Sequence, residues 1–173
     1  GVLAGALLTA VIQSSSASVG ILQALAITGS ISYSTAFPII LGQNIGTCIT
    51  AIISSVGTNK NAKRTAVVHL CFNVIGVTLA MIIFYGINAI FGLPFYHDKV
   101  NAANIAVIHT VFNIFATIVL FPFGKQLEKL ACIIIPDNKK DVKQPLIDEK
   151  FLMTPSYALD KVKERCDKMG NLA

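Results

Sequence analysis

The sequence predicts an all-α polytopic membrane protein: a re-entrant helical hairpin, about three transmembrane helices and then an amphipathic cytosolic helix. Hydrophobic residues make up 54% of the chain and charged residues 13%, with a mean hydropathy of +0.67. Such a composition favours lipid over water as the main solvent. The first charged residue is Lys60, and most charges fall after residue 124. We therefore expect a membrane domain over residues 1–124, a polar linker over 125–150, and the beginning of a cytosolic helical domain over 151–173.

Two short apolar segments, Gly1 to Ile12 and Ala17 to Gly29, flank the polar stretch QSSS. At 1.5 Å per residue each reaches only about 20 Å, less than the roughly 30 Å of a bilayer core. The segments form either one long helix with the serines inside it or two half-helices of a re-entrant hairpin, which needs a protein or polar environment at its tip. Alternatively, the serines are small residues that allow close helix packing.

A second polar cluster, GQNIGTCIT, interrupts the third apolar segment, which runs from about Ala36 to Val56. Its two glycines, with Pro38 nearby, weaken a helix and predict a break. Neutral amide and hydroxyl oxygens suit a hard cation such as sodium, and freed N–H groups at a half-helix N-terminus attract an anion. Neither cluster contains Asp or Glu, which argues against a carboxylate proton relay there.

Two uncharged segments, Thr65 to about Phe91 and Asn104 to Gly124, are long enough to cross a bilayer. The basic loop TNKNAKR precedes the first, and lysines follow the second. Two crossings separate these basic regions, so both should lie on one side, which the positive-inside rule makes cytoplasmic. The loop around Phe95 to Lys99 would then face outward.

The motif His-x-x-Phe-Asn occurs in both of these segments, at a spacing of 40 residues. In each copy the His and the Asn lie four residues apart, on one face of a helix. We expect these side chains to make secondary polar contacts between helices, with direct substrate contact as the alternative. They are His69, Asn73, His109 and Asn113.

Other functional classes find little support. The four cysteines are far apart without metal-like spacing, and no basic stripe carries the aromatics of a nucleic-acid surface. An enzyme is disfavoured because the chain has no G-x-S-x-G motif and its proposed spans lack Asp and Glu. The chain begins at Gly1 without a basic n-region, so we expect a fragment of a longer protein rather than a signal peptide.

The C-terminal residues predict one amphipathic helix. Thr154 can cap it, with Pro155 at the first helical position. Apolar residues then recur at helical spacing. They are Leu159, Val162, Cys166 and Met169. A helix this short is only marginally stable alone, so we expect it to pack against partner helices.

The pair GALLTAVIQSSSAS and GQNIGTCIT resembles the type II sodium/phosphate cotransporter family, specifically its bacterial branch. Members carry a QSSS hairpin in each of two inverted repeats, followed by a G-[AQ]-N-I-G-T segment. Residues 1–124 resemble the second repeat, and the closing residues are similar to the start of a PhoU-like domain. Only one QSSS is present here, so the first repeat, a partner in the shared site, is missing.

The resemblance implies that the hairpin tip and the GQNIGT segment bind sodium and phosphate. Gln43 stands where many relatives have Ala, so it is either a ligand or a neighbour of one. The implied sodium- and phosphate-binding residues are Gln13, Ser14, Ser15, Ser16, Gln43, Asn44 and Thr47.

The expected function is sodium-coupled symport of inorganic phosphate across the plasma membrane, with a cytoplasmic C-terminal tail. The alternative is a non-transporting membrane protein that reports phosphate status through its PhoU-like tail. We expect no cofactor, no metal besides transported sodium, and no nucleic acid. The expected partners are sodium, phosphate, the lipid bilayer and the missing first repeat, and a homo-oligomer is compatible with the sequence.

Overall fold

The structure is a computed structural model that describes residues 1–137 together with Lys163 and Asp167. It divides into two units, residues 1–136 and 137–173, and almost all described residues belong to the first. Apart from Lys163 and Asp167, the predicted helix from Thr154 to Met169, and with it the PhoU-like domain, lies outside the described residues.

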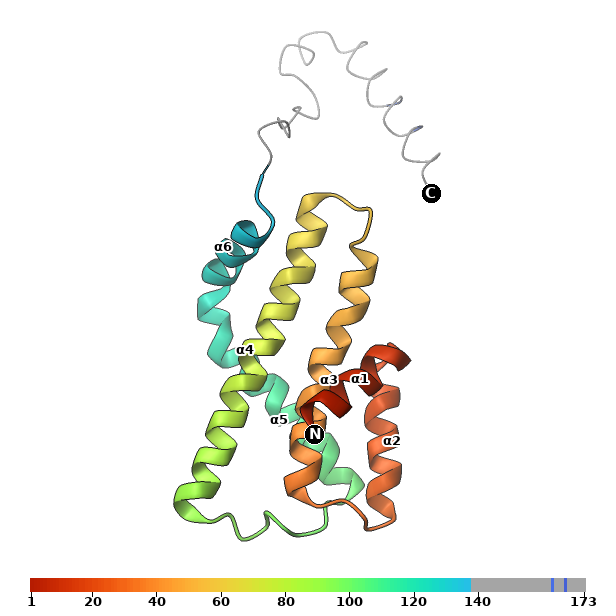
Figure 1. The fold of residues 1–173 in the computed structure, drawn as a ribbon, viewed down its shortest axis with the longest axis vertical. Helices are drawn as coiled ribbons and strands as arrows, with labels where there is room; N and C mark the ends of the chain where they lie inside the picture. The colour runs from red at the N-terminus through yellow and green to blue at the C-terminus, as the bar shows by residue number, and fades with distance from the viewer. Residues whose placement is uncertain (138–162, 164–166, 168–173) are drawn as a thin grey trace. The chain divides into compact units, whose positions relative to one another are not determined.

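The first unit is all-helical, as predicted, apart from one isolated bridge between Ser32 and Lys99. Three of its helices are long and apolar enough to cross a membrane, so the chain is a multi-pass membrane protein. Figure 1 shows these helices running side by side. In chain order the elements are α1 (Val2–Ile12), α2 (Ser15–Ile27), α3 (Tyr33–Ser54), α4 (Lys60–Phe91), α5 (Ala102–Leu120), the 3₁₀ turn η1 (Phe121–Phe123) and α6 (Gly124–Ile134).

The chain breaks between α1 and α2 at the polar stretch, as the short flanking segments predicted. Gln13 adopts a left-handed conformation with φ 58°, and Ser14 follows in extended conformation with φ −143°. A non-glycine residue at positive φ is uncommon and ends the right-handed helix. The single long helix is therefore excluded, and Figure 1 shows α1 turning across α3 while α2 runs along it.

The break predicted at GQNIGT is absent, because α3 is one continuous helix through Gly42 and Gly46. The glycines have a different purpose: they let α1 cross α3 with the two backbones almost touching. A Cβ added to Gly42 would lie 2.8 Å from the Val2 carbonyl carbon, and one added to Gly46 would lie 2.5 Å from the Ala6 oxygen. Gly5 of α1 meets the Ile39 backbone in the same way. Small residues at such crossings are typical of helix packing in membranes.

The loop between α4 and α5 closes the end of the bundle at which α3 begins. Tyr33 N donates to the Asp98 carbonyl at 3.1 Å and Ser34 N to the Tyr96 carbonyl at 3.0 Å. These bonds satisfy two of the N–H groups that the first turn of α3 leaves unpaired. The loop therefore fixes the start of α3 relative to α4 and α5.

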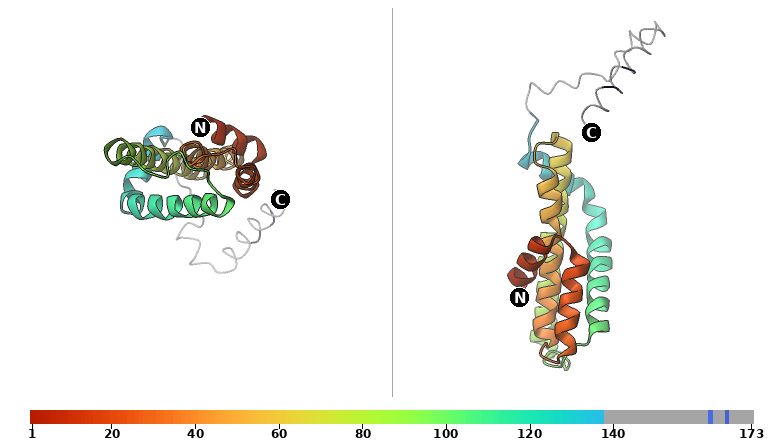
Figure 2. Two further views of the ribbon diagram at one scale, coloured as in Figure 1. Left: turned by 90° about the horizontal axis from the view of Figure 1, so that it is seen from below. Right: turned by 90° about the vertical axis from the view of Figure 1, so that its right-hand side faces the viewer.

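The end of α6 lies against the beginning of α4. Arg64 donates from Nε and Nη2 to the Ile135 carbonyl, at 3.0 and 2.9 Å. The two basic regions therefore lie at one end of the bundle, as the two predicted crossings require. Residues 124–134 are helical, so the segment predicted as a polar linker begins with a helix. Figure 2 shows α6 turning from the direction of α5 toward α4.

Candidate functional site

The break between α1 and α2 exposes a cluster of unpaired polar groups. The amide of Gln13 is exposed, and neither it nor the Ser15 hydroxyl has a hydrogen-bond partner within residues 1–137. Ser14 caps α2 by accepting a bond from Ala17 N at 3.3 Å, and its hydroxyl lies 3.2 Å from that of Ser16. The tip thus combines free side-chain donors and acceptors with the N-terminus of a helix, which favours an anion.

A buried hydrogen-bond chain connects the two short helices to α3. Thr9 Oγ1 of α1 donates to Ser18 Oγ of α2 at 2.7 Å. Gln43 Nε2 of α3 then donates to the Ser18 carbonyl at 3.0 Å. All three residues are fully shielded from solvent, with 0% exposure. In an interior without water, breaking such a hydrogen bond leaves a buried polar group unpaired, which is costly. These hydrogen bonds therefore hold α1, α2 and α3 together.

Gln43 also carries an acceptor that nothing satisfies. Its Oε1 is buried and has no hydrogen-bond partner in the described part of the chain. Leaving a buried acceptor unpaired costs about 1–3 kcal/mol. An unsatisfied group of this kind in a fold needs an explanation in function or in a missing partner.

The other polar residues of α3 bond within their own helix. Asn44 Nδ2 donates to the Ile40 carbonyl at 3.0 Å, and Thr47 Oγ1 donates to the Asn44 carbonyl at 2.5 Å. Asn44 is buried and Thr47 is half-buried. Their side chains thus stay on a continuous helix rather than on unwound backbone.

The structure brings the hairpin and the GQNIGT segment together through one predicted residue, Gln43, and two residues outside the predicted set, Thr9 and Ser18. The link is Ser18 of the sequence SSSAS to Gln43, with Thr9 behind it, whereas the exposed tip from Gln13 to Ser16 makes no hydrogen bond to α3 in the described chain. Thr9 is a lone hydroxyl within an apolar helical segment and Ser18 ends the run SSSAS, and those are the sequence signals that could have identified them.

The two His-x-x-Phe-Asn copies adopt the same local structure. Asn73 Nδ2 donates to the His69 carbonyl at 3.0 Å, and Asn113 Nδ2 to the His109 carbonyl at 2.7 Å. Asn73 is buried, and the His69 carbonyl that it bonds also accepts from Cys48 Sγ of α3 at 3.6 Å, whereas Asn113 is exposed. At the first copy the contact between α4 and α3 thus runs through the His69 carbonyl, and Asn113 of the second copy faces outward in this chain; the predicted contacts by the His and Asn side chains stay a prediction.

Comparison with known proteins gives a consistent set of relatives. The chain is 36% identical over 134 residues to the uncharacterized protein YqeW of Bacillus subtilis, covering 78% of this chain and 43% of that protein. It is 25% identical to the putative inorganic phosphate export protein YjbB of Salmonella typhimurium, over 98% of this chain and 31% of that one. It is 33% identical to human sodium-dependent phosphate transport protein 2B, over 69% of this chain and 17% of that protein. No solved structure matches.

The chain spans less than half the length of each of these relatives. The family model described as Na+/Pi-cotransporter matches residues 1–135, which includes every helix from α1 to α6. That family is one of transporters rather than enzymes. On this match, the chain belongs to the Na+/Pi-cotransporter family.

Proposed function

We propose that this chain is the C-terminal half of a sodium-coupled symporter of inorganic phosphate in the plasma membrane. The proposal extends the family assignment to a substrate, a coupling ion and a direction. Human and Salmonella relatives are named for phosphate, and the human one also for sodium dependence. The first repeat of the whole protein would complete the site, as the resemblance implies.

The observation that carries the proposal is the unpaired polar tip between α1 and α2. Gln13 and Ser15 offer an amide and a hydroxyl with no protein partner within residues 1–137. They stand where the C-terminal end of α1 meets the N-terminal end of α2. A helix C-terminus attracts a cation and a helix N-terminus attracts an anion, so one tip can serve both ions.

The absence of charge near the tip supports coupling to a cation. Residues 1–59 contain no Asp, Glu, Lys or Arg. A phosphate anion leaving water for such a region needs a positive charge nearby, because an uncompensated buried charge costs several kcal/mol. Sodium bound at the same tip would supply that charge, so phosphate would bind well only together with sodium.

The packing of the hairpin suggests which part moves. The hydrogen-bond chain from Thr9 to Gln43 and the glycine contacts make α1, α2 and α3 one unit. Alternating access would then come from this unit rocking against the first repeat of the whole protein, with the tip carried along. In this scheme Ser14 and Ser16 orient the tip, and Asn44 and Thr47 lie on the helix behind it.

Export is a second candidate direction. The Salmonella relative, named as a putative phosphate exporter, aligns with 98% of this chain, including the residues after α6. Import remains the first choice. The tip has no charged side chain of its own, so phosphate binding would require sodium, and the inward sodium gradient would then drive phosphate inward.

The test is phosphate flux through the full-length protein reconstituted in vesicles. Labelled phosphate is followed with a sodium gradient directed inward, directed outward, or absent. We expect uptake that follows the inward sodium gradient. Flux that ignores sodium contradicts the coupling, and an absence of flux under all three conditions favours the non-transporting reporter of phosphate status.

A further inference from the structure

We propose that α6 is an interfacial helix that binds anionic lipid headgroups through Lys125 and Lys129 while its apolar face enters the acyl region. The proposal is independent of what the protein transports. It rests on three features: the position of α6, the division of its surface, and the unpaired state of its lysines.

The position of α6 follows from the length of α5. α5 has 19 residues, which at 1.5 Å per residue is about 29 Å, close to the thickness of a bilayer core. The 3₁₀ turn η1 then redirects the chain, and Pro122 in this turn prevents a straight continuation. α6 therefore begins where the hydrocarbon ends. Its contact with the start of α4, through Arg64 and Ile135, holds it there.

The surface of α6 is divided into three faces by its helical period. Leu127 and Ala131 are buried against the bundle. On one side of this buried line lies an exposed apolar face, and on the other side lie the charged residues. The apolar face consists of Leu130, Ile133 and Ile134, with 38%, 74% and 53% of their surfaces exposed, and the exposed Gln126 lies among them by helical period. The charged face consists of Lys125, Glu128 and Lys129.

This division fits the boundary between headgroups and acyl chains. A helix with one apolar and one basic face lies in the interface plane, with its apolar side chains in the acyl boundary and its lysines among phosphates. The aromatic rings of Phe121 and Phe123, which are also exposed, precede the helix at the same level. Water would leave five large apolar side chains unburied here, so the bilayer is the occupant that the surface fits.

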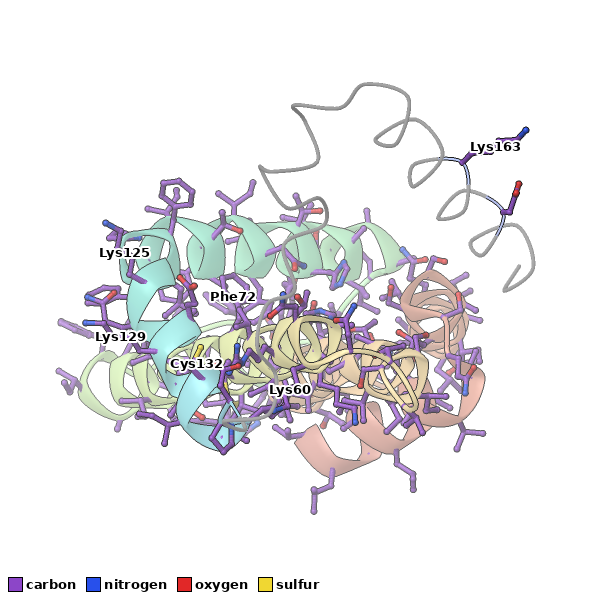
Figure 3. The ribbon with its side chains drawn as sticks, turned by 90° about the horizontal axis from the view of Figure 1, so that it is seen from above. Lys60, Phe72, Lys125, Lys129, Cys132 and Lys163 are labelled. Carbon is purple, nitrogen blue, oxygen red and sulfur yellow. The ribbon has the colours of Figure 1, made fainter. Side chains whose placement is uncertain are left out.

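The lysines of α6 are available for a phosphate. Both are exposed, and neither has an ion-pair partner within residues 1–137. Figure 3 shows Lys125 and Lys129 at the rim of the bundle, with Cys132 nearer its middle. The two lysines therefore lie at the edge of the described bundle, whereas Glu128, the single acid of the charged face, lines a pocket beside Arg64 of α4.

The absence of tryptophan in the chain permits a direct test. Ile133→Trp places one fluorophore on the apolar face, and Ile90→Trp places another at the opposite end of the bundle, at a site that is 77% exposed. The full-length protein, with any tryptophan outside this chain replaced by phenylalanine, is reconstituted with phosphatidylcholine or phosphatidylglycerol brominated along the acyl chains. Quenching in mixtures of the two lipids gives the relative binding constant of phosphatidylglycerol beside each tryptophan.

We expect strong quenching of the tryptophan at position 133 and a preference for phosphatidylglycerol. Each lysine near an anionic surface contributes about fivefold, so Lys125→Gln with Lys129→Gln should lower the preference by roughly 30-fold at low salt. Glu128→Gln should raise it. Lys99→Gln, the same change at the other end, should leave it unaltered, and the tryptophan at position 90 should show no preference.

Two results would overturn the proposal. Equal quenching by both lipids would show an immersed helix that does not select headgroups. No quenching by either lipid would show that protein, rather than lipid, covers α6.

Discussion

The contact of α1 with α3 and the contact of α4 with α5 are built from opposite kinds of residue. Where α1 crosses α3, glycines bring the backbones together, and the buried polar chain from Thr9 to Gln43 crosses nearby. Between α4 and α5, large apolar side chains such as Phe84 and Phe112 leave an open groove of about 330 Å³. Close backbone packing leaves no room for sliding, whereas side-chain packing with space can rearrange. The difference indicates that the polar tip belongs to the rigid part of the molecule.

The largest effect is expected from a single methyl group at the α1–α3 crossing. In Gly42→Ala the new Cβ would lie 2.8 Å from the Val2 carbonyl carbon, and neither backbone can yield. We expect a loss of about 3 kcal/mol in stability and separation of α1 from α3. Thermal unfolding in detergent measures the first, and cysteine crosslinking between the two helices measures the second.

The matched control is Gly86→Ala in α4, where an added Cβ meets nothing within 4 Å. Removing a glycine from a helix interior should stabilise it by about 0.5–1 kcal/mol. If Gly42→Ala behaves like Gly86→Ala, the rigid crossing does not exist.

A smaller loss is expected from breaking the buried hydrogen-bond chain. Thr9→Val keeps the shape but removes the hydroxyl that donates to Ser18 Oγ. We expect about 1–2 kcal/mol of destabilisation, because the Ser18 oxygen remains buried. Thr78→Val is the control: this exposed threonine bonds to the Val74 carbonyl of its own helix. Equal unfolding temperatures for the two variants would contradict a structural role for the chain.

Substitution of Gln43 should change stability least of the three sites, but it should strongly reduce transport. In Gln43→Leu one hydrogen bond to Ser18 is lost, but an unsatisfied buried acceptor is removed as well. The two terms nearly cancel, so stability should change by less than about 1 kcal/mol. Phosphate flux should nevertheless fall if the amide holds the hairpin for function. Unchanged flux would show that Gln43 is only a packing residue.

The sequence predicted the features that depend on local length and polarity. The segments flanking QSSS are too short to cross a bilayer, and the structure breaks the chain there at Gln13 and Ser14. The three long helices also follow from uninterrupted apolar length, and the structure confirms them. The resemblance to the cotransporter family, carried by QSSS and GQNIGT, is confirmed by the family match.

The features that the sequence could not predict depend on what lies across the contact. A glycine can either weaken a helix or admit a neighbouring backbone, and Gly42 and Gly46 have the second role in an unbroken α3. Likewise Thr9 and Ser18 are unremarkable hydroxyls until folding places them beside each other and Gln43. The residues expected to bind ions remain a prediction, since the resemblance implies that half of the proposed site belongs to a first repeat outside this chain.

The most direct test of the central claim is sodium-driven phosphate uptake by two variants of the full-length protein. Ser15→Ala removes an unpaired hydroxyl from the tip, whereas Thr110→Val removes an exposed hydroxyl from α5. A hydrogen bond to a charged ligand contributes about 1.5–3 kcal/mol, so Ser15→Ala should lower the apparent phosphate affinity by roughly tenfold or more. Thr110→Val should leave uptake unchanged. Equal affinity in both variants would contradict the assignment of the tip as the binding site.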